Sequence, residues 1–244
     1  MLFESEFKSF GKERVVFNDF DLSILFENLN KDMLFLRFFG LRKLNIEKSI
    51  KMEREFESIK KEIIERRYII PKGIYGIYRV KTSKKLLTLY SDAEYKIPLE
   101  INEDGFSIAD FLSEQDYVAL TSASCFLNND SLDFYVDLND FKKRHIINSI
   151  DIMLAEAFTE VLHYLAAKNR GLKVCIEPKE LYLHKNPGKR YSPGYPGLDI
   201  SVNKTIHQIL KAYEIGSSIT ESAMIEPESS VQSIIVFNDK AFYL

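Results

Sequence analysis

The chain has 244 residues, of which 45% are hydrophobic and 28% charged, and its formal net charge is −3 at pH 7. This composition is ordinary for a globular protein and excludes a disordered one. The small negative charge argues against nucleic acid as the main partner, because phosphate binding needs an excess of Lys and Arg on one face. A chain of this length buries enough surface to fold without a disulfide or a metal.

The cysteines and the apolar runs bear on where the protein works. Cys125 and Cys175 both lie in apolar segments, so we expect buried small side chains and no disulfide. No apolar run approaches the roughly 20 residues of a membrane span. Residues 1–17 mix charges throughout and lack the apolar core of a signal peptide. We therefore expect a protein of the reducing cytoplasm with no membrane partner.

In chain order, residues 1–20 are predicted to form an N-terminal arm and residues 21–244 a single domain. Apolar spacing predicts helices, in sequence order, over 21–29, 47–67, 107–112, 140–170 and 201–215. Segments rich in β-branched and aromatic residues predict strands or extended pieces over 73–80, 86–91, 96–100, 116–123 and 230–237. The apolar run after Asp32 fits a helix or a strand. Because the strands and helices come in separate runs, the sequence predicts an α+β fold with an antiparallel sheet flanked by helices.

Motifs for common chemistries are weak or missing. The chain has no GxGxxG and no GxxxxGK[ST], and its four histidines do not have the spacing of metal ligands. Two S-x-x-K matches, at residues 9–12 and 201–204, are within chance. We therefore predict no catalytic residue and no metal ligand in the chain itself.

Arg190–Pro196, with the sequence RYSPGYP, is an unusual loop. Two prolines restrict the backbone on either side of Gly194 and Tyr195, and a glycine there suits a positive φ or a ligand lying close to the main chain. Arg190 offers a planar cation for a carboxylate, and Tyr195 offers a ring face. From these residues alone, a binding loop and a plain surface loop both remain open.

The same loop resembles the Arg-x-x-Pro-Gly-Tyr-Pro segment of the activation domain of cobalamin-dependent methionine synthase. The similarity runs in one order from about residue 22 to the C-terminus. Its other segments in this chain are Pro71–Gly76, Ala109-Asp110-Phe111 with Asp116-Tyr117, Leu154–Phe158 with Leu162-His163, Ile219–Ser222, and Ser230-Val231. Each segment is weak alone, and together they are fairly specific.

The resemblance implies that the domain binds S-adenosylmethionine. In that family the loop backbone contacts the adenine, an arginine takes the methionine carboxylate, and an N-terminal aspartate takes the ammonium. Arg190 and Asp32 stand in the last two places, Glu156 stands near the sulfonium, and either Phe242 or Tyr243 replaces a family tyrosine. The implied ligand contacts are Asp32, Glu156, Arg190, Ser192, Gly194, Tyr195, Phe242 and Tyr243. Arg190 would then face a groove, so its loss should cost affinity and little stability.

The resemblance also implies a role in methionine biosynthesis. The chain would support reductive methylation of a cob(II)alamin-bearing methionine synthase, or a related corrinoid protein, together with a flavodoxin-like reductant. It lacks the Asp-x-His-x-x-Gly cobalamin signature, so cobalamin would come only through a partner and the chain would act in trans, as a free-standing activation component of a methyltransferase system. Whether it is itself an enzyme stays open. His184 stands where the family has an acidic residue. The absence of Trp and the weak local match around Asp32 favour an alternative: a corrinoid-protein docking or regulatory module that has lost S-adenosylmethionine binding.

Overall fold

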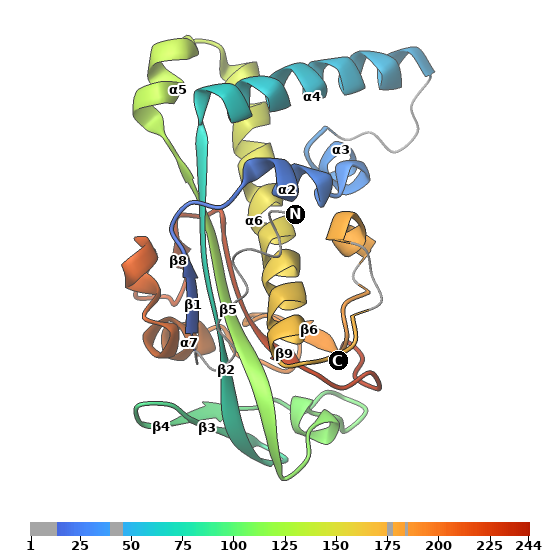
Figure 1. Ribbon diagram of the computed structural model, residues 1–244, viewed down its shortest axis with the longest axis vertical. Helices are drawn as coiled ribbons and strands as arrows, with labels where there is room; N and C mark the ends of the chain where they lie inside the picture. Colours follow the sequence, from blue (N-terminus) through green and yellow to red (C-terminus); the bar gives the residue numbers. More distant parts are fainter. Residues whose placement is uncertain (1–13, 40–45, 175–177, 184) are drawn as a thin grey trace.

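The computed structural model describes residues 14–39, 46–174, 178–183 and 185–244 (Figure 1). In chain order the elements are β1 (Arg14–Phe17), α2 (Leu22–Glu27), α3 (Lys31–Phe39), α4 (Ile46–Arg66), β2 (Ile69–Ser83), β3 (Leu86–Tyr90), β4 (Glu94–Pro98), the 3-10 helix η1 (Ile108–Phe111), β5 (Gln115–Leu127), α5 (Asn129–Tyr135), α6 (Phe141–Asn169), η2 (Pro178–Leu183), β6 (Lys189–Tyr191), α7 (Val202–Leu210), η3 (Ala212–Ile215), β7 (Ser218–Ile219), β8 (Ile225–Glu226) and β9 (Ser230–Val236).

A seven-stranded antiparallel sheet forms the centre of the fold, with the strand order β4-β3-β2-β5-β9-β6 and with β1 also paired to β2. Its longest ladder joins β2 and β5, from Ile69 opposite Leu127 to Lys81 opposite Gln115. β7 and β8 form a separate two-stranded hairpin. The predicted α+β class with an antiparallel sheet is confirmed.

Helices cover both faces of the sheet. Figure 1 shows α6 along the β2–β5 ladder, with α7 on the opposite side. Successive residues of a strand point to opposite faces, and β5 follows that rule. Ala119 and Ala123 join the core cluster under α6, while Val118 and Leu120 join the cluster under α7. The sheet is therefore buried on two sides, and its β9–β6 edge lies beside α6.

The long helix α6 sets up the site. It spans 29 residues, and the side chain of its N-cap residue, Asp140, accepts a hydrogen bond from the Lys143 amide. Most of its side chains from Ile146 to Ala167 are buried on nearly every side, because the sheet, α2, α3 and η2 all contact it. A charged side chain that is buried in this part of α6 is therefore stabilised by its neighbours and not by bulk water.

The structure also resolves or adds to several sequence expectations. The run after Asp32 is the helix α3, and Cys125 is a buried free thiol as predicted. Residues 14–17, which were predicted to belong to the N-terminal arm, form β1 and pair with β2. The described residues do not include the rest of residues 1–17, Cys175 or His184. Helix α5 and strand β6 were not predicted. In the part of the chain described here, no helix has the length and apolarity to cross a bilayer.

Candidate functional site

Arg190 is held between two carboxylates of α6. It lies on the edge strand β6, opposite Ile235 of β9. Its Nε donates to Glu160 Oε1 at 3.1 Å, and one terminal nitrogen donates to Glu156 Oε2 at 3.3 Å. Glu156 and Glu160 are one helical turn apart, so both project from the same face of α6. The strand thus places a cation directly against two acids of the helix.

The two acids differ in exposure. The Arg190 side chain is 11% exposed and that of Glu160 only 4%, whereas Glu156 is 42% exposed. Asn186 fixes Glu160 further, because its Nδ2 contacts both Glu160 Oε2 at 3.1 Å and the Glu160 main-chain oxygen at 3.2 Å. Glu160 is therefore the permanent counterion of Arg190, and Glu156 reaches the solvent.

These surroundings keep Arg190 charged. Burial by itself would lower the pKa of Arg190, but the carboxylates of Glu160 and Glu156 outweigh it and raise that pKa above its ordinary value. The Arg190 Nη1 also lies 3.5 Å from Ser192 Oγ. A charged guanidinium with donors left over suits a ligand carboxylate.

The Pro-Gly-Tyr loop is tightly closed. Gly194 has φ +86, and its amide donates to the Leu198 carbonyl at 2.9 Å. A Cβ at this position would lie 3.0 Å from Ile200 Cδ1. The positive φ that the sequence allowed is therefore present, and the turn leaves Tyr195 69% exposed.

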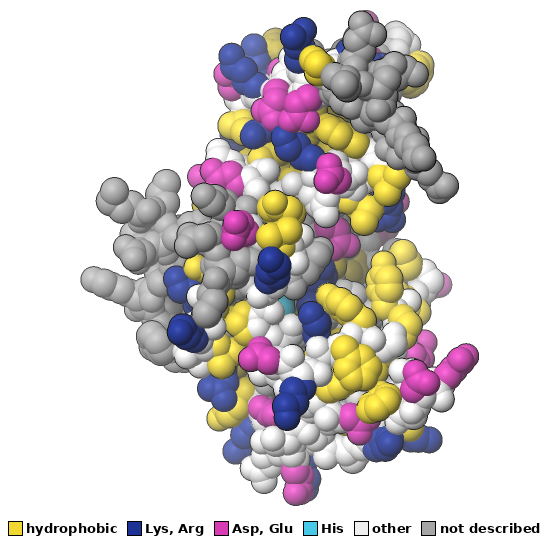
Figure 2. All heavy atoms as spheres, turned by 90° about the vertical axis from the view of Figure 1, so that its right-hand side faces the viewer, with side chains coloured by type: hydrophobic (Ala, Val, Ile, Leu, Met, Phe, Trp, Pro, Cys, Tyr) yellow, Lys and Arg dark blue, Asp and Glu magenta, His cyan; other side chains and the backbone are white. Residues whose placement is uncertain are grey.

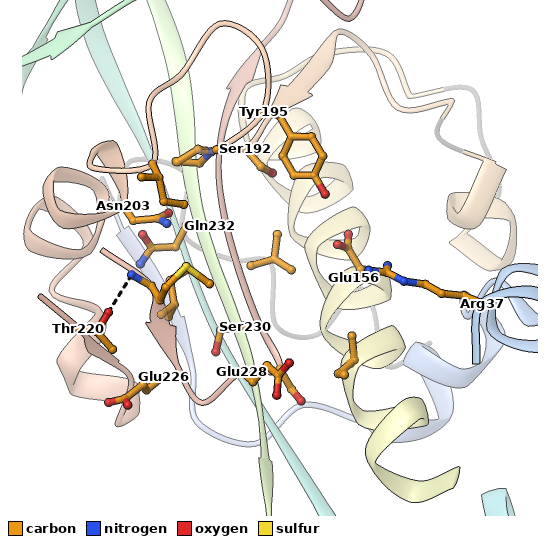
Figure 3. Close-up of a pocket in the computed structure, with 18 residues that line it drawn as sticks. Arg37, Glu156, Ser192, Tyr195, Asn203, Thr220, Glu226, Glu228, Ser230 and Gln232 are labelled. Atoms are coloured by element: carbon orange, nitrogen blue, oxygen red, sulfur yellow. Dashed lines mark hydrogen bonds between the residues drawn. The ribbon is translucent and has the colours of Figure 1, made fainter. Parts of the chain in front are cut away.

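Three cavities meet around Glu156. The large cavity, of about 850 Å³, lies between α6, the Pro-Gly-Tyr loop, α7, the β7–β8 hairpin and β9 (Figure 3). The Arg190 cavity, of about 410 Å³, lies beneath Tyr195 and Tyr243. The α3 cavity, of about 210 Å³, lies between α3 and α6. Glu156 lines all three, and Ser192 and Tyr195 line the first two, so the first two cavities form adjacent parts of one groove.

Acidic side chains outnumber basic ones around the large cavity. Glu156, Glu226 and Glu228 line it, against Arg37 alone. Figure 3 shows Arg37 extending from α3 toward Glu156. On the face shown in Figure 2, which is the right-hand side of the view in Figure 1, basic and acidic side chains are interspersed. The cavity therefore favours a neutral or cationic group over a phosphate.

Most of the predicted site residues meet in this groove. Glu156, Arg190, Ser192, Gly194, Tyr195 and Tyr243 all line at least one of its cavities. Tyr243 lies close enough to Arg190 and the two acids for their charges to act on its pKa, which burial raises above the ordinary value. Whether these residues contact a ligand stays a prediction.

Phe242 and Asp32 lie outside the three cavities. The Phe242 ring packs against Phe106 and Phe111, with centroids 5.4 and 4.9 Å away, and its carbonyl accepts a hydrogen bond from Tyr191. Of the two C-terminal aromatics, Tyr243 is thus the one facing the groove. Asp32 is exposed in the first turn of α3, and its neighbour Met33 lines the α3 cavity.

Sequence reasoning missed Glu160, which pairs with Arg190, and two polar residues of the groove. Glu160 follows Glu156 by one turn of a recognisable helix, and that spacing was a usable signal. Asn203 and Gln232 line the large cavity from α7 and β9. No motif includes either residue, and only the packing of α7 against the sheet shows them.

Comparisons with known proteins show the family and the fold of the chain. Residues 14–244 match the family model of the vitamin B12 dependent methionine synthase activation domain. Among solved structures, a crystal structure of the MetH reactivation domain bound to AdoHcy aligns with a TM-score of 0.80 at 19% identity, over 95% of this chain and 80% of that one. At this identity the likeness shows a shared fold. No curated protein sequence matches the chain.

Proposed function

This chain belongs to the activation-domain family of vitamin B12-dependent methionine synthase, and from that premise we propose that it binds S-adenosylmethionine and supports reductive methylation of a corrinoid protein in the cob(II)alamin state. The observation that carries the proposal is Arg190, a buried cation that opens into a groove beside the Pro-Gly-Tyr loop. The neighbour of the same fold is described as bound to AdoHcy, the product that S-adenosylmethionine becomes when its methyl group leaves.

Binding requires a change of partner at Arg190. Glu160 is buried and fixed by Asn186, so it stays on the guanidinium. Glu156 is half exposed and forms the longer contact, of 3.3 Å. We infer that the ligand carboxylate displaces Glu156 from Arg190. The freed carboxylate of Glu156 then faces the sulfonium of the same ligand, so Glu156 exchanges one cationic partner for another.

The groove has room for the whole molecule. Ligand sites typically enclose about 300–1,000 Å³, and the large cavity alone measures about 850 Å³. The methionine end would lie in the Arg190 cavity and the adenosine end in the large cavity. Glu156, Ser192 and Tyr195, which line both, would flank the sulfonium between them. The exposed ring of Tyr195 can hold a sulfonium through its π face without acting as a nucleophile.

The corrinoid is proposed to belong to another polypeptide, so that this chain acts in trans. These 244 residues contain no Asp-x-His-x-x-Gly segment. The partner's cobalt, reduced by one electron from a flavodoxin-like donor, supplies the nucleophile for the methyl group. The residues of this chain bind the methyl donor and orient it toward the open side of the groove. We propose the cytoplasm as the setting, in keeping with the buried free thiol of Cys125.

Two observations favour a second candidate. Arg190 already has two carboxylate partners, and Asp32 lies outside all three cavities. A chain with this arrangement could dock on a corrinoid protein without binding the ligand. In the primary proposal Asp32 takes the ligand ammonium, so Asp32→Asn should weaken binding.

Two measurements test the proposal. Calorimetric titration should show S-adenosylmethionine binding at micromolar strength or weaker, with a rise in melting temperature that follows ligand concentration, and no binding of ATP. Absence of heat and of any melting shift at millimolar ligand removes the primary proposal. If the chain then still co-migrates with a corrinoid protein, the docking alternative replaces it.

The second measurement addresses action in trans. The isolated chain is mixed with the cobalamin-binding region of a methionine synthase in the cob(II)alamin form, a reduced flavodoxin and methyl-labelled S-adenosylmethionine. We expect the visible spectrum of methylcobalamin and transfer of the label, both dependent on this chain. Methylcobalamin formation at the same rate without the chain would contradict the activation role even if the ligand binds.

A further inference from the structure

Two buried amide side chains that line the large cavity have oxygens without a hydrogen-bond donor. Asn203 is 4% exposed and Gln232 only 1%, and both line the cavity. Among the described residues, neither Asn203 Oδ1 nor Gln232 Oε1 meets a donor. Figure 3 shows both side chains across the cavity from Glu156. A buried acceptor without a donor costs free energy, so two in one cavity indicate a site completed by a ligand.

The orientation of Asn203 is fixed by its other bond. Its Nδ2 donates to the Ala223 carbonyl at 3.0 Å. Rotating the amide would place its oxygen against the Ala223 oxygen, so Oδ1 is the atom left without a partner. The Gln232 Nε2 lies 3.4 Å from the Ser122 hydroxyl. The residues that line the cavity therefore include two acceptor oxygens without a donor, Asn203 Oδ1, whose identity is fixed, and Gln232 Oε1.

The rest of the lining narrows the ligand chemistry. Glu226 and Glu228 belong to the same cavity, so an incoming phosphate or carboxylate would meet like charge. An apolar group would leave both acceptor oxygens unsatisfied. An exocyclic amino group suits the site, because it is uncharged and carries two N–H donors. The Pro-Gly-Tyr loop lines the cavity too, through Ser192, Pro193, Gly194 and Tyr195, so a planar base can lie against its backbone.

We propose that Asn203 and Gln232 are the specificity-determining residues for adenine, with the 6-amino group of the base donating to Asn203 Oδ1 and to Gln232 Oε1. This inference rests on the proposed binding of S-adenosylmethionine. It assigns the adenosine end of the ligand to the α7–β9 side of the large cavity, on the opposite side from Arg190. Because the amino group is the only part of the base that these oxygens need, the site selects adenine over a purine that lacks it.

The test compares two ligands on one protein. Calorimetry measures the Kd of S-adenosylmethionine and of its analogue with hydrogen at the purine 6-position. The wild-type chain should bind the analogue on the order of 10-fold more weakly, the effect of losing hydrogen bonds to buried acceptors. In Asn203→Ala that ratio should fall toward unity. Asn238→Ala is the matched control. Like Asn203, Asn238 donates its Nδ2 to a main-chain oxygen, here that of Phe111 at 2.9 Å, but it lines none of the three cavities. This variant should keep the wild-type ratio of the two Kd values.

The outcomes separate this inference from the proposed function. Equal affinity of the wild-type chain for the two ligands overturns the adenine assignment and leaves S-adenosylmethionine binding intact. The oxygens of Asn203 and Gln232 would then accept hydrogen bonds from water alone. No binding of either ligand contradicts the proposed function and this inference with it. Should Asn203→Ala not fold, Gln232→Leu provides the same comparison, because it removes the second acceptor with little change in volume. A wild-type ratio retained in the folded variant overturns the assignment.

Discussion

Glu160 and Arg190, 30 residues apart in the chain, form a buried ion pair that joins the long helix to the edge of the sheet. Replacing one member of such a pair leaves the other charge buried without a partner, which typically costs about 3–5 kcal/mol. The sequence alone suggested that Arg190 faces a groove and contributes little stability. Its burial against Glu160 changes that expectation.

Arg190→Ala should therefore have two separable effects. Ligand affinity should fall by about 2–4 kcal/mol, the range for a lost charge-assisted contact, and the free energy of unfolding should fall as well, because Glu160 stays buried. Urea denaturation and calorimetry measure the two effects. The double variant Arg190→Ala/Glu160→Leu should regain stability without regaining affinity. Unchanged affinity in a folded Arg190→Ala protein would show that the arginine is purely structural.

Glu156→Gln should reduce discrimination between S-adenosylmethionine and S-adenosylhomocysteine. The carboxylate is half exposed, so its attraction for the sulfonium is screened, and we expect at most about a 5-fold loss for the charged ligand. S-adenosylhomocysteine carries no sulfonium, and its affinity should change less. Glu114→Gln, at an exposed acid that lines none of the three cavities, is the control. Equal losses for both ligands would mean that Glu156 does not face the sulfonium.

Gly194→Ala should weaken ligand binding by distorting the Pro-Gly-Tyr loop. Alanine at a φ of +86 is strained by about 1–2 kcal/mol, and its Cβ would lie 3.0 Å from Ile200 Cδ1. Gly105 has a similar φ of +84, but a Cβ there would meet no atom within 4 Å. Gly105→Ala should thus lose comparable stability and keep its affinity for S-adenosylmethionine. Equal affinities in the two variants would exclude a role for the loop in binding.

Asp151 should make stability depend on pH. Burial raises the pKa of its carboxyl to about 7. The Ser229 hydroxyl donates a hydrogen bond to Asp151 Oδ2 at 2.5 Å, which lowers this pKa but does not outweigh burial. The folded state therefore holds a proton that the unfolded state releases near pH 4, so stability falls as the pH rises from about 4 to 7. Urea midpoints at pH 5 to 8 should decline in the wild-type chain and decline less in Asp151→Asn. Parallel curves for the two proteins would rule out this titration.

Elements with a local signal could be predicted from the sequence. The apolar period of residues 140–170 predicted α6, because a helix buried against a sheet needs apolar side chains at every turn. The prolines around Gly194 indicated a rigid turn, and its positive φ is present. Strand segments without βαβ alternation predicted the antiparallel sheet. The ordered motifs around the loop identified the family, which the match over residues 14–244 confirms.

Tertiary structure alone decided which side chains meet. The apolar run after Asp32 fits two periods equally well, and its packing on α6 makes it a helix. β6 is only three residues long, and its pairing with β9 brings Arg190 onto Glu156 and Glu160. Asn203 and Gln232 share a cavity because α7 packs beside β9. The periodicity of a segment indicates whether that segment forms a helix or a strand. The register between distant strands depends instead on the burial of the whole core, so no short motif encodes it.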